Sequence, residues 1–204
     1  QMVLVVGVGG LIGKNLFQFF GDRYQGIFGT THQKEHVGKN SVFHLDLLHP
    51  DFGFLSDIGS SVTHAVICSG VTRFDECSKD EARSSWINVT NMSRLFDQLW
   101  DNNIVPVFLS TDAVFEGNRG GYTELDDCRP KTVYGRQKLE AENHLRAGQN
   151  PWLILRLSKV YDVRYHDETL ITSCLDSLLS GKLVHSATDQ FIAPVHVGDV
   201  CRAI

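Results

Sequence analysis

The stretch that decides the fold is "MVLVVGVGGLIGKNLFQFF", residues 2–20. Residues 2–6 form a continuous aliphatic run, which is typical of a strand buried on both faces of a parallel sheet. Apolar side chains then recur at helical spacing over residues 11–20. Between them, Gly7, Gly10 and Gly13 mark a glycine-rich turn. A strand, such a turn and a helix in this order predict a dinucleotide-binding loop.

Each glycine has its own role in a loop of this kind. Gly7 permits the tight turn, Gly10 lets the backbone approach a pyrophosphate, and Gly13 lets the helix pack closely on the strand. The start of the helix then supplies N–H donors and the positive end of the helix dipole. The alternative is a glycine-rich turn that binds no ligand.

Outward from this stretch, buried apolar runs alternate with helical patterns. Strands are expected at 26–30, 41–46, 62–70, 104–112 and 152–161, with short ones in 181–186 and 190–195; helices are expected over 80–102, 132–147 and 167–180. The alternation predicts an α/β fold with a doubly wound (Rossmann), mostly parallel sheet and helices on both faces. Ligands then bind beyond the carboxyl ends of the strands. The expected core face of the helix over 80–102 is Trp86, Val89, Leu95, Phe96 and Leu99.

The totals exclude several classes of protein. The chain has 204 residues and a formal net charge of −5, without a cluster of Lys and Arg, so a nucleic-acid partner is not expected. No apolar run is long enough to span a bilayer, and the chain opens directly into a strand rather than a secretory signal. Five scattered cysteines without Cys-x-x-Cys favour reduced thiols and a cytoplasmic location. The nine histidines show no metal-ligand spacing, so no metal is expected.

A second motif lies in "TVYGRQKLEAE", residues 132–142. Tyr134 and Lys138 are four residues apart, which makes their side chains neighbours on one face of a helix. The phenol and the ammonium can therefore share a site. The alternative is a solvated helix with an ordinary lysine, because the spacing alone is a weak signal.

Together, the two motifs resemble the extended short-chain dehydrogenases/reductases, where a Gly-x-x-Gly-x-x-Gly loop precedes a Tyr-x-x-x-Lys pair. Further boxes sharpen the resemblance over essentially the whole chain. These are "STDAVFEG" (110–117), "YTELDDCRPKTVYGRQKLEAE" (122–142), "LRLSKVY" (155–161) and "TDQFIAP" (188–194). They look like the dTDP-4-dehydrorhamnose reductase subgroup. The resemblance implies a single NAD(P)-binding Rossmann domain over 1–204, with 159–204 as the start of a small C-terminal substrate lobe.

The resemblance also implies roles for single residues. Thr111 matches the hydroxyl that hydrogen-bonds the substrate carbonyl, Tyr134 the proton donor, and Lys138 the residue that binds the nicotinamide ribose. Asn88 matches a structural asparagine, or else is an amide that only packs the helix. The implied cofactor contacts are Gly7, Gly10, Leu11, Ile12 and Gly13 in the loop, Asp46 and Leu47 beside adenine, Ser69 and Gly70 against the adenine ribose, and Tyr134 and Lys138. For Asp46 the alternative is the cap of a turn.

The Tyr-Lys pair makes a chemical expectation possible. A free tyrosine has a pKa near 10, and moving this pKa toward 7 requires roughly 4 kcal/mol. An ammonium about 4 Å away contributes roughly that much at an effective dielectric constant near 20. We therefore expect Lys138 to lower the pKa of Tyr134.

Two positions depart from the subgroup. Ala113 stands where a Tyr usually follows "STD", and Lys159 stands where a Trp is usual. Both positions face the sugar nucleotide in relatives, so the substrate pocket is expected to differ. Asp112, Ala113, Lys159 and Gln190 are the expected substrate residues.

The end of the second strand bears on the choice of cofactor. NAD-selective sites place an Asp or Glu there, and this carboxylate repels a 2′-phosphate. Here Thr31, His32 and Lys34 follow the strand, and the first acid is Glu35. Thr31 and His32 can donate hydrogen bonds to a phosphate, and Lys34 can add a charge-assisted one. NADP(H) is therefore favoured and NAD remains possible; the alternative is a solvated loop.

The sequence thus leaves three functions open. The first is an NAD(P)H-dependent reductase of a nucleotide-sugar ketone, with a small-molecule substrate and possible homodimer formation. The second is a non-catalytic, cofactor-binding regulatory subunit similar to that of methionine adenosyltransferase. The third is another extended-family enzyme, such as a nucleotide-sugar epimerase; a dehydratase is disfavoured because Asp112 is followed by Ala113 rather than by Glu.

Overall fold

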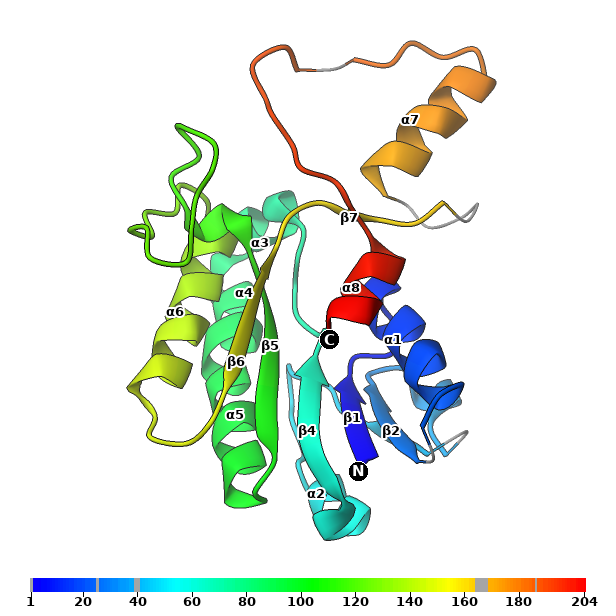
Figure 1. The fold of residues 1–204 in the computed structure, drawn as a ribbon, viewed down its shortest axis with the longest axis vertical. Helices are drawn as coiled ribbons and strands as arrows, with labels where there is room; N and C mark the ends of the chain where they lie inside the picture. Colours follow the sequence, from blue (N-terminus) through cyan, green and yellow to red (C-terminus); the bar gives the residue numbers. More distant parts are fainter. Residues whose placement is uncertain (1, 25, 39–40, 164–168, 186) are drawn as a thin grey trace. The chain divides into compact units, whose positions relative to one another are not determined.

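The structure is a computed structural model that describes all residues of the chain except 1, 25, 39–40, 164–168 and 186. Six strands form one sheet in the order β3-β2-β1-β4-β5-β6 (Figure 1). They are β1 (Met2–Val6), β2 (Ile27–Thr31), β3 (Val42–His44), β4 (Val62–Ile67), β5 (Val105–Thr111) and β6 (Leu153–Leu157). Pairing is parallel from β3 through to β5. The predicted Rossmann fold is confirmed.

The helices cover both sides of this sheet. In Figure 1, α1 (Leu11–Gly21) lies on one side, against β1 and β2, and α5 (Met92–Asp101) and α6 (Val133–Ala147) lie on the other, against β5. Shorter elements are α2 (Phe54–Ile58), α3 (Phe74–Lys79), α4 (Glu81–Ser85) and the turns η1 (Lys34–His36), η2 (Gly59–Ser61) and η4 (Asp112–Val114). The strand order reverses between β1 and β4. A crevice for a ligand opens at such a reversal, beyond the carboxyl ends of the strands.

The expected single helix over 80–102 is divided into α4, a π-helical turn η3 (Trp86–Asn91) and α5. A π turn holds more residues than an α turn, so the buried face shifts along the sequence. Trp86 is 47% exposed, and its expected core position was wrong; Asn91 is buried instead. Val89 is only partly buried. Beyond the π turn the expected core face is confirmed by the burial of Leu95, Phe96 and Leu99.

The C-terminal stretch differs more from expectation. The expected strand over 152–161 is two strands, β6 and β7 (Val160–Tyr161), and α7 (Leu170–Leu179) confirms the helix, of which 167–168 lie outside the described residues. The described part of 181–186 contains no strand, and of 190–195 only Val195 belongs to one, β8 (Val195–His196). Strand propensity without a partner strand does not suffice to form a sheet. The last helix is α8 (Val197–Ala203).

The chain divides into two compact units, residues 1–156 and residues 157–204. The first holds β1 to β5, α1 to α6 and most of β6. The second holds β7, β8, α7 and α8, with β7 and β8 paired in parallel. The boundary falls two residues before the expected start of the substrate lobe at 159, and the assignment of the second unit as that lobe stays a prediction.

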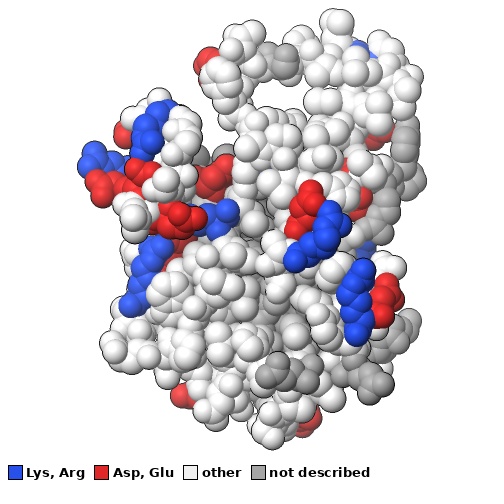
Figure 2. All heavy atoms as spheres, viewed as in Figure 1, with Lys and Arg blue, Asp and Glu red and all other residues white. Residues whose placement is uncertain are grey.

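The core of the first unit lies between the sheet and its helices. Phe96 of α5 and Phe108 of β5 pack edge to face, with ring centroids 5.2 Å apart, and both are fully buried. On the face shown in Figure 2, basic and acidic side chains are interspersed rather than gathered into a patch of one sign. Among the described residues, no helix combines the length and apolar character that a membrane span requires.

Candidate active site

Three glycines shape the loop between β1 and α1. Gly7 has a φ of +93°, a conformation that favours glycine, and a Cβ there would lie 3.0 Å from Ser69. A Cβ on Gly13 would lie 2.0 Å from the carbonyl oxygen of Gly7, so α1 packs on the loop only because residue 13 lacks a side chain. A Cβ on Gly10 would meet nothing nearer than 4.0 Å. The backbone at Gly10 is therefore the part of the loop that a ligand can approach.

The groups around this loop fit an anionic dinucleotide. Gly10 precedes α1 and provides no side-chain cap for the helix, whose first turn includes Leu11 and Ile12, so N–H groups point outward there. After β4, the Oγ of Ser69 is buried and has no hydrogen-bond partner among the described residues. Because buried polar atoms in proteins are nearly always paired, a ligand hydroxyl or phosphate beside the glycine loop would satisfy this one. Gly70 follows with a φ of +138°.

The residues expected beside adenine have structural partners. Asp46 accepts a hydrogen bond from the backbone N–H of Leu48, at 2.8 Å, which is the turn-capping alternative. Leu47 is 6% exposed, and its carbonyl accepts a hydrogen bond of 2.8 Å from the Asn91 amide. These contacts fix the chain after β3. A contact of Asp46 and Leu47 with adenine stays a prediction.

The end of β2 separates the three residues expected to contact a 2′-phosphate. Thr31 is buried, and its hydroxyl accepts a hydrogen bond of 3.1 Å from the backbone N–H of Gln33. His32 and Lys34 are exposed, and Lys34 begins η1. The two exposed side chains are therefore better placed than Thr31 to contact a phosphate in solvent.

The hydroxyls of Thr111 and Tyr134 meet at the carboxyl end of β5. Both side chains are buried, and Thr111 is close enough to the phenol to lower its pKa, while the Thr111 hydroxyl donates a hydrogen bond of 3.3 Å to the Asp112 carboxylate. Gly135 makes this approach possible, because a Cβ there would lie 2.2 Å from the carbonyl oxygen of Ala113. Thr132 caps the helix by accepting the Gly135 N–H at 3.0 Å. Gly135 was not singled out from the sequence; the Tyr-Gly pair that opens the helix was the available signal.

Lys138 lies one turn further along α6 and is only 6% exposed. Its Nζ donates a hydrogen bond of 2.6 Å to the carbonyl oxygen of Leu109 and lies 3.8 Å from the centroid of the Phe108 ring. Burial lowers the pKa of Lys138 to about 7, although the Glu142 carboxylate and the Cys68 thiol act in the opposite direction. The amino group is thus held against β5, and its burial there makes the protonated form less favourable.

The expectation that Lys138 lowers the pKa of Tyr134 was wrong for the protein without a bound cofactor. Burial raises the pKa of Tyr134 to about 12, with Cys77 and Asp112 adding to the shift and the hydrogen bond from Thr111 opposing it. The ammonium of Lys138 does not offset this, because it is directed toward Leu109 and Phe108. The phenol is therefore protonated at neutral pH, which is the form that a proton donor needs.

Asn88 connects the π turn to the neighbouring segments. Its amide accepts from the N–H of Val71 and donates to the Val71 carbonyl, both at 2.8 Å, and it donates to the Gln137 side chain at 2.9 Å. Gln137 in turn donates to Ser84 at 2.8 Å. Asn88 thereby fixes the chain after β4 to the first turns of α6. These contacts favour the packing alternative for Asn88.

The four expected substrate residues are divided between the units. Asp112 and Ala113 follow Thr111 in η4, with Asp112 exposed and close enough to affect the pKa of Tyr134. Lys159 and Gln190 belong to the second unit, where both are exposed. The carbonyl oxygen of Lys159 accepts the Val195 N–H at 2.9 Å. A substrate role for any of the four stays a prediction.

One aromatic neighbour of the tyrosine escaped the sequence reasoning. Phe74, the first residue of α3, lies with its ring centroid 5.4 Å from that of Tyr134 and is 44% exposed. It supplies an apolar surface next to the phenol. No spacing rule pointed to it, because it lies 60 residues before Tyr134 in the sequence.

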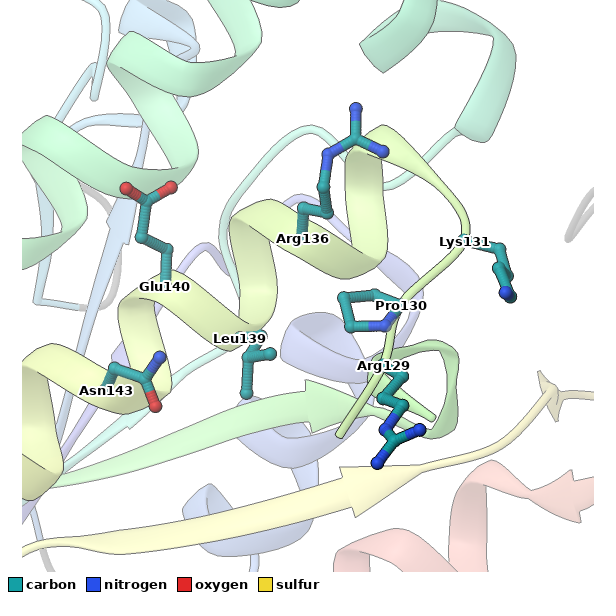
Figure 3. A pocket seen from close by; sticks show the side chains of 7 residues that line it. All are labelled: Arg129, Pro130, Lys131, Arg136, Leu139, Glu140 and Asn143. Atoms are coloured by element: carbon teal, nitrogen blue, oxygen red, sulfur yellow. The ribbon is translucent and has the colours of Figure 1, made fainter. Parts of the chain in front are cut away.

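The pocket shown in Figure 3 is separate from this constellation. It is formed by side chains of α6 and of the segment that leads into it. Neither Tyr134 nor Lys138 lines it, and the candidate active site is the group of residues at the carboxyl ends of β1, β4 and β5, where the hydroxyls and the glycine loop are found. The pocket is lined by Arg129, Pro130, Lys131, Arg136, Leu139, Glu140 and Asn143.

The fold and the glycine loop define a protein of the Rossmann-fold class. More closely, the model of the family described as "RmlD substrate binding domain" matches residues 1–204, and the chain belongs to that family. The predicted resemblance to the dTDP-4-dehydrorhamnose reductase subgroup is confirmed.

Three curated relatives show the range of this family. A probable low-salt glycan biosynthesis reductase, Agl14, from Haloferax volcanii is 28% identical over 96% of this chain and 67% of its own length. The dTDP-4-dehydrorhamnose reductase of Aggregatibacter actinomycetemcomitans is 24% identical over 99% of this chain and 65% of its own. Methionine adenosyltransferase 2 subunit beta of Bos taurus is 24% identical over 100% of this chain and 62% of its own length. The chain spans about two thirds of the length of these relatives.

A solved structure shares the fold. MoeE5 in complex with UDP-glucose and NAD superimposes with a TM-score of 0.84 at 22% identity, covering 100% of this chain and 70% of MoeE5. At this level of identity the likeness shows the fold alone.

Proposed function

We propose that the protein is an NAD(P)H-dependent reductase of a nucleotide-sugar ketone. The observation that carries the proposal is the pair of hydroxyls at the carboxyl end of β5, Thr111 and Tyr134, with Lys138 one helical turn away. The glycine loop at the neighbouring strand β1 fits the dinucleotide that such chemistry requires. The reductases among the relatives support the same class of reaction.

The geometry suits the reduction of a carbonyl. When bound, the reduced nicotinamide supplies the hydride. Thr111 and Tyr134 hydrogen-bond the carbonyl oxygen of the substrate, and Tyr134 transfers its proton to that oxygen as negative charge develops. Lys138 holds the ribose of the cofactor near the phenol. The raised pKa of Tyr134 keeps the proton on the phenol until the substrate oxygen becomes basic.

The substrate class is a proposal drawn from the family. Two relatives are named for reductions in glycan and dTDP-rhamnose chemistry. Ala113 replaces the usual Tyr and Lys159 the usual Trp, so the sugar is expected to differ from the dTDP-4-dehydrorhamnose of the second relative. A methyl group and a cation in place of two aromatic rings favour a smaller apolar contact and an acidic or phosphate-bearing partner.

For the cofactor we propose NADPH over NADH. Lys34 and His32 are exposed after β2, and the first acidic side chain of that segment is Glu35. An exposed ammonium favours the 2′-phosphate of NADPH, whereas the carboxylate that would select NADH is lacking at the end of the strand. NADH remains a usable cofactor on this proposal, because the loop contains no arginine, the residue whose planar guanidinium binds phosphate most specifically.

A regulatory subunit is the second candidate, since methionine adenosyltransferase 2 subunit beta aligns over the whole chain. Such a protein would keep the cofactor site without turnover. The paired hydroxyls of Thr111 and Tyr134 favour the enzyme. Homodimer formation stays a prediction, which sedimentation at several concentrations would test.

A direct assay decides between the candidates. Purified protein is mixed with a panel of UDP- and dTDP-linked 4-ketosugars, and the loss of NADPH absorbance is followed, with Tyr134→Phe as the matched control. Turnover by the wild type alone supports the reductase. Dinucleotide binding by calorimetry without turnover of any ketosugar supports the regulatory subunit instead.

A further inference from the structure

A buried carboxylate lies one helical turn beyond Lys138. Glu142 is fully buried, and its Oε1 accepts hydrogen bonds from the Ser110 hydroxyl at 2.5 Å and from Nε of Arg156 at 3.1 Å. Its Oε2 is 2.7 Å from a terminal nitrogen of Arg156 and 3.0 Å from one of Arg146. Burying a carboxylate has a large desolvation cost, and this cost is offset only when nearly all its lone pairs accept hydrogen bonds.

Glu142 lies on the same face of α6 as Tyr134 and Lys138. Tyr134, Lys138 and Glu142 are spaced four residues apart on α6 and so lie along one face of the helix. Two of them are hydrogen-bonded to the end of β5: the ammonium to the Leu109 carbonyl, and the carboxylate to the Ser110 hydroxyl. Two successive residues of β5 are thus hydrogen-bonded to two successive turns of α6, and Thr111 follows them beside the phenol of Tyr134.

We propose that Glu142 is a positioning residue that holds the end of β5 against α6 and keeps Lys138 positively charged for the cofactor ribose. The proposal rests on the reductase function proposed above and deepens it. Through Ser110, the carboxylate fixes the strand between the Leu109 carbonyl and the Thr111 hydroxyl. Through space, its charge favours the ammonium of Lys138.

The positive charges that face Glu142 keep its carboxylate ionised, as its effect on Lys138 requires. Two guanidinium groups oppose the carboxylate, Arg146 from α6 and Arg156 from β6, and Arg156 also contacts the thiol of Cys128 at 3.1 Å. Their contacts hold the pKa of Glu142 below its usual range, although burial alone would raise it. Removing the negative charge would take away the opposite charge that lies one helical turn from Lys138 and raises its pKa. The pKa of Lys138 must then fall further.

The test reads the charge of Lys138 directly. NMR of 13C,15N-lysine-labelled protein, with Lys138→Arg to assign the signal, follows the Lys138 Cε resonance from pH 5.5 to 9.5. For the wild type we expect a midpoint near the value of about 7 that burial sets. For Glu142→Gln we expect a midpoint lower by about one pH unit, the effect of one nearby opposite charge.

The matched control is Glu140→Gln, which removes the same charge from an exposed position of the same helix. Its midpoint should equal that of the wild type. NADPH affinity at pH 7 should fall about fivefold in Glu142→Gln, because fewer molecules then carry the ammonium, and should not change in the control. Equal midpoints for the wild type and Glu142→Gln would overturn the proposal.

Folding and function are kept separate in this design. If Glu142→Gln does not fold, the double variant Glu142→Leu with Arg156→Met replaces the ion pair by apolar side chains, which proteins often tolerate. Its Lys138 midpoint should be lower than that of the single variant Arg156→Met, and equal midpoints in these two variants contradict the inference. Because the titration needs no ligand, a wild type that binds no dinucleotide sinks the reductase proposal while the midpoints still decide the role of Glu142.

Discussion

The glycine loop after β1 and the β5–α6 face build one site by opposite means. In the loop, the absence of side chains matters: Gly13 packs where any Cβ would lie 2.0 Å from a carbonyl oxygen, and Gly10 leaves the backbone open. On the β5–α6 face, buried polar side chains matter, and each has its partner on another element. The loop is therefore a support without charged side chains, whereas the β5–α6 face carries the charges and the phenol proton.

The sharpest way to break this comparison is a pair of substitutions in the loop itself. Gly13→Val should prevent folding, because its side chain would overlap the Gly7 carbonyl. Gly10→Val should fold and lose dinucleotide binding by more than about 100-fold, because its side chain would occupy the space where the pyrophosphate approaches. Circular dichroism and calorimetry with NADPH measure both. A folded Gly10→Val with wild-type affinity would mean that the loop is only a turn.

On the other face, Tyr134→Phe should lower turnover by about 1,000-fold, within the range for loss of a general acid. The ring remains packed against Phe74, so NADPH affinity should stay within about threefold of the wild type. Steady-state kinetics on a turned-over ketosugar, with calorimetry alongside, gives both numbers. Full activity in Tyr134→Phe would remove the tyrosine from the mechanism.

The comparison also explains what could be predicted from the sequence. The loop is local: strand, glycines and helix are contiguous, so residues 2–20 suffice to predict it. The Tyr-Lys spacing is local too. The contacts of Lys138 with Leu109 and of Glu142 with Ser110 join residues about 30 apart in the chain, as the sequence separations of 29 and 32 show. Such pairing depends on how α6 packs on β5, and no spacing rule contains it.

The same reason accounts for the wrong expectation about the tyrosine. Spacing along α6 placed an ammonium beside Tyr134 but could not reveal that the Leu109 carbonyl accepts its hydrogen bond. Similarly, the π turn that exposes Trp86 has no signature in the hydrophobic pattern. The sequence reasoning succeeded for neighbours along one element and failed where a second element competes for the same group.

Burial of Lys138 should be visible in the stability of the protein. Its pKa falls from 10.5 in the unfolded chain to about 7 when folded, so the unfolded state binds more protons between these values and stability rises with pH there. Below pH 7 the full cost applies, at 1.36 kcal/mol per pKa unit. Lys138→Met removes this cost but leaves the Leu109 carbonyl unpaired, a loss of about 1–3 kcal/mol.

Lys138→Met should therefore be more stable than the wild type at pH 6, by about 3 kcal/mol, and less stable at pH 10.5. Urea denaturation at both pH values measures the difference. The control is Lys34→Met, an exposed lysine, which should change stability little at either pH. If the difference in unfolding free energy between Lys138→Met and the wild type does not vary with pH, burial does not lower the pKa of Lys138.

The smallest expected effect returns to the end of β2, next to the loop. There Lys34 is exposed and the Thr31 hydroxyl is already occupied by the Gln33 N–H, so selection of a 2′-phosphate depends on one ammonium and the His32 ring. We expect NADPH to bind about tenfold more tightly than NADH, or about 1.4 kcal/mol. Lys34→Ala should remove most of this preference and leave NADH binding unchanged, because only NADPH carries the phosphate. Calorimetry with both cofactors decides it, with Lys182→Ala as a control for loss of an exposed lysine outside the glycine loop. Equal or tighter NADH binding by the wild type would refute the preference, since a single charge in solvent is then too weak to select the cofactor.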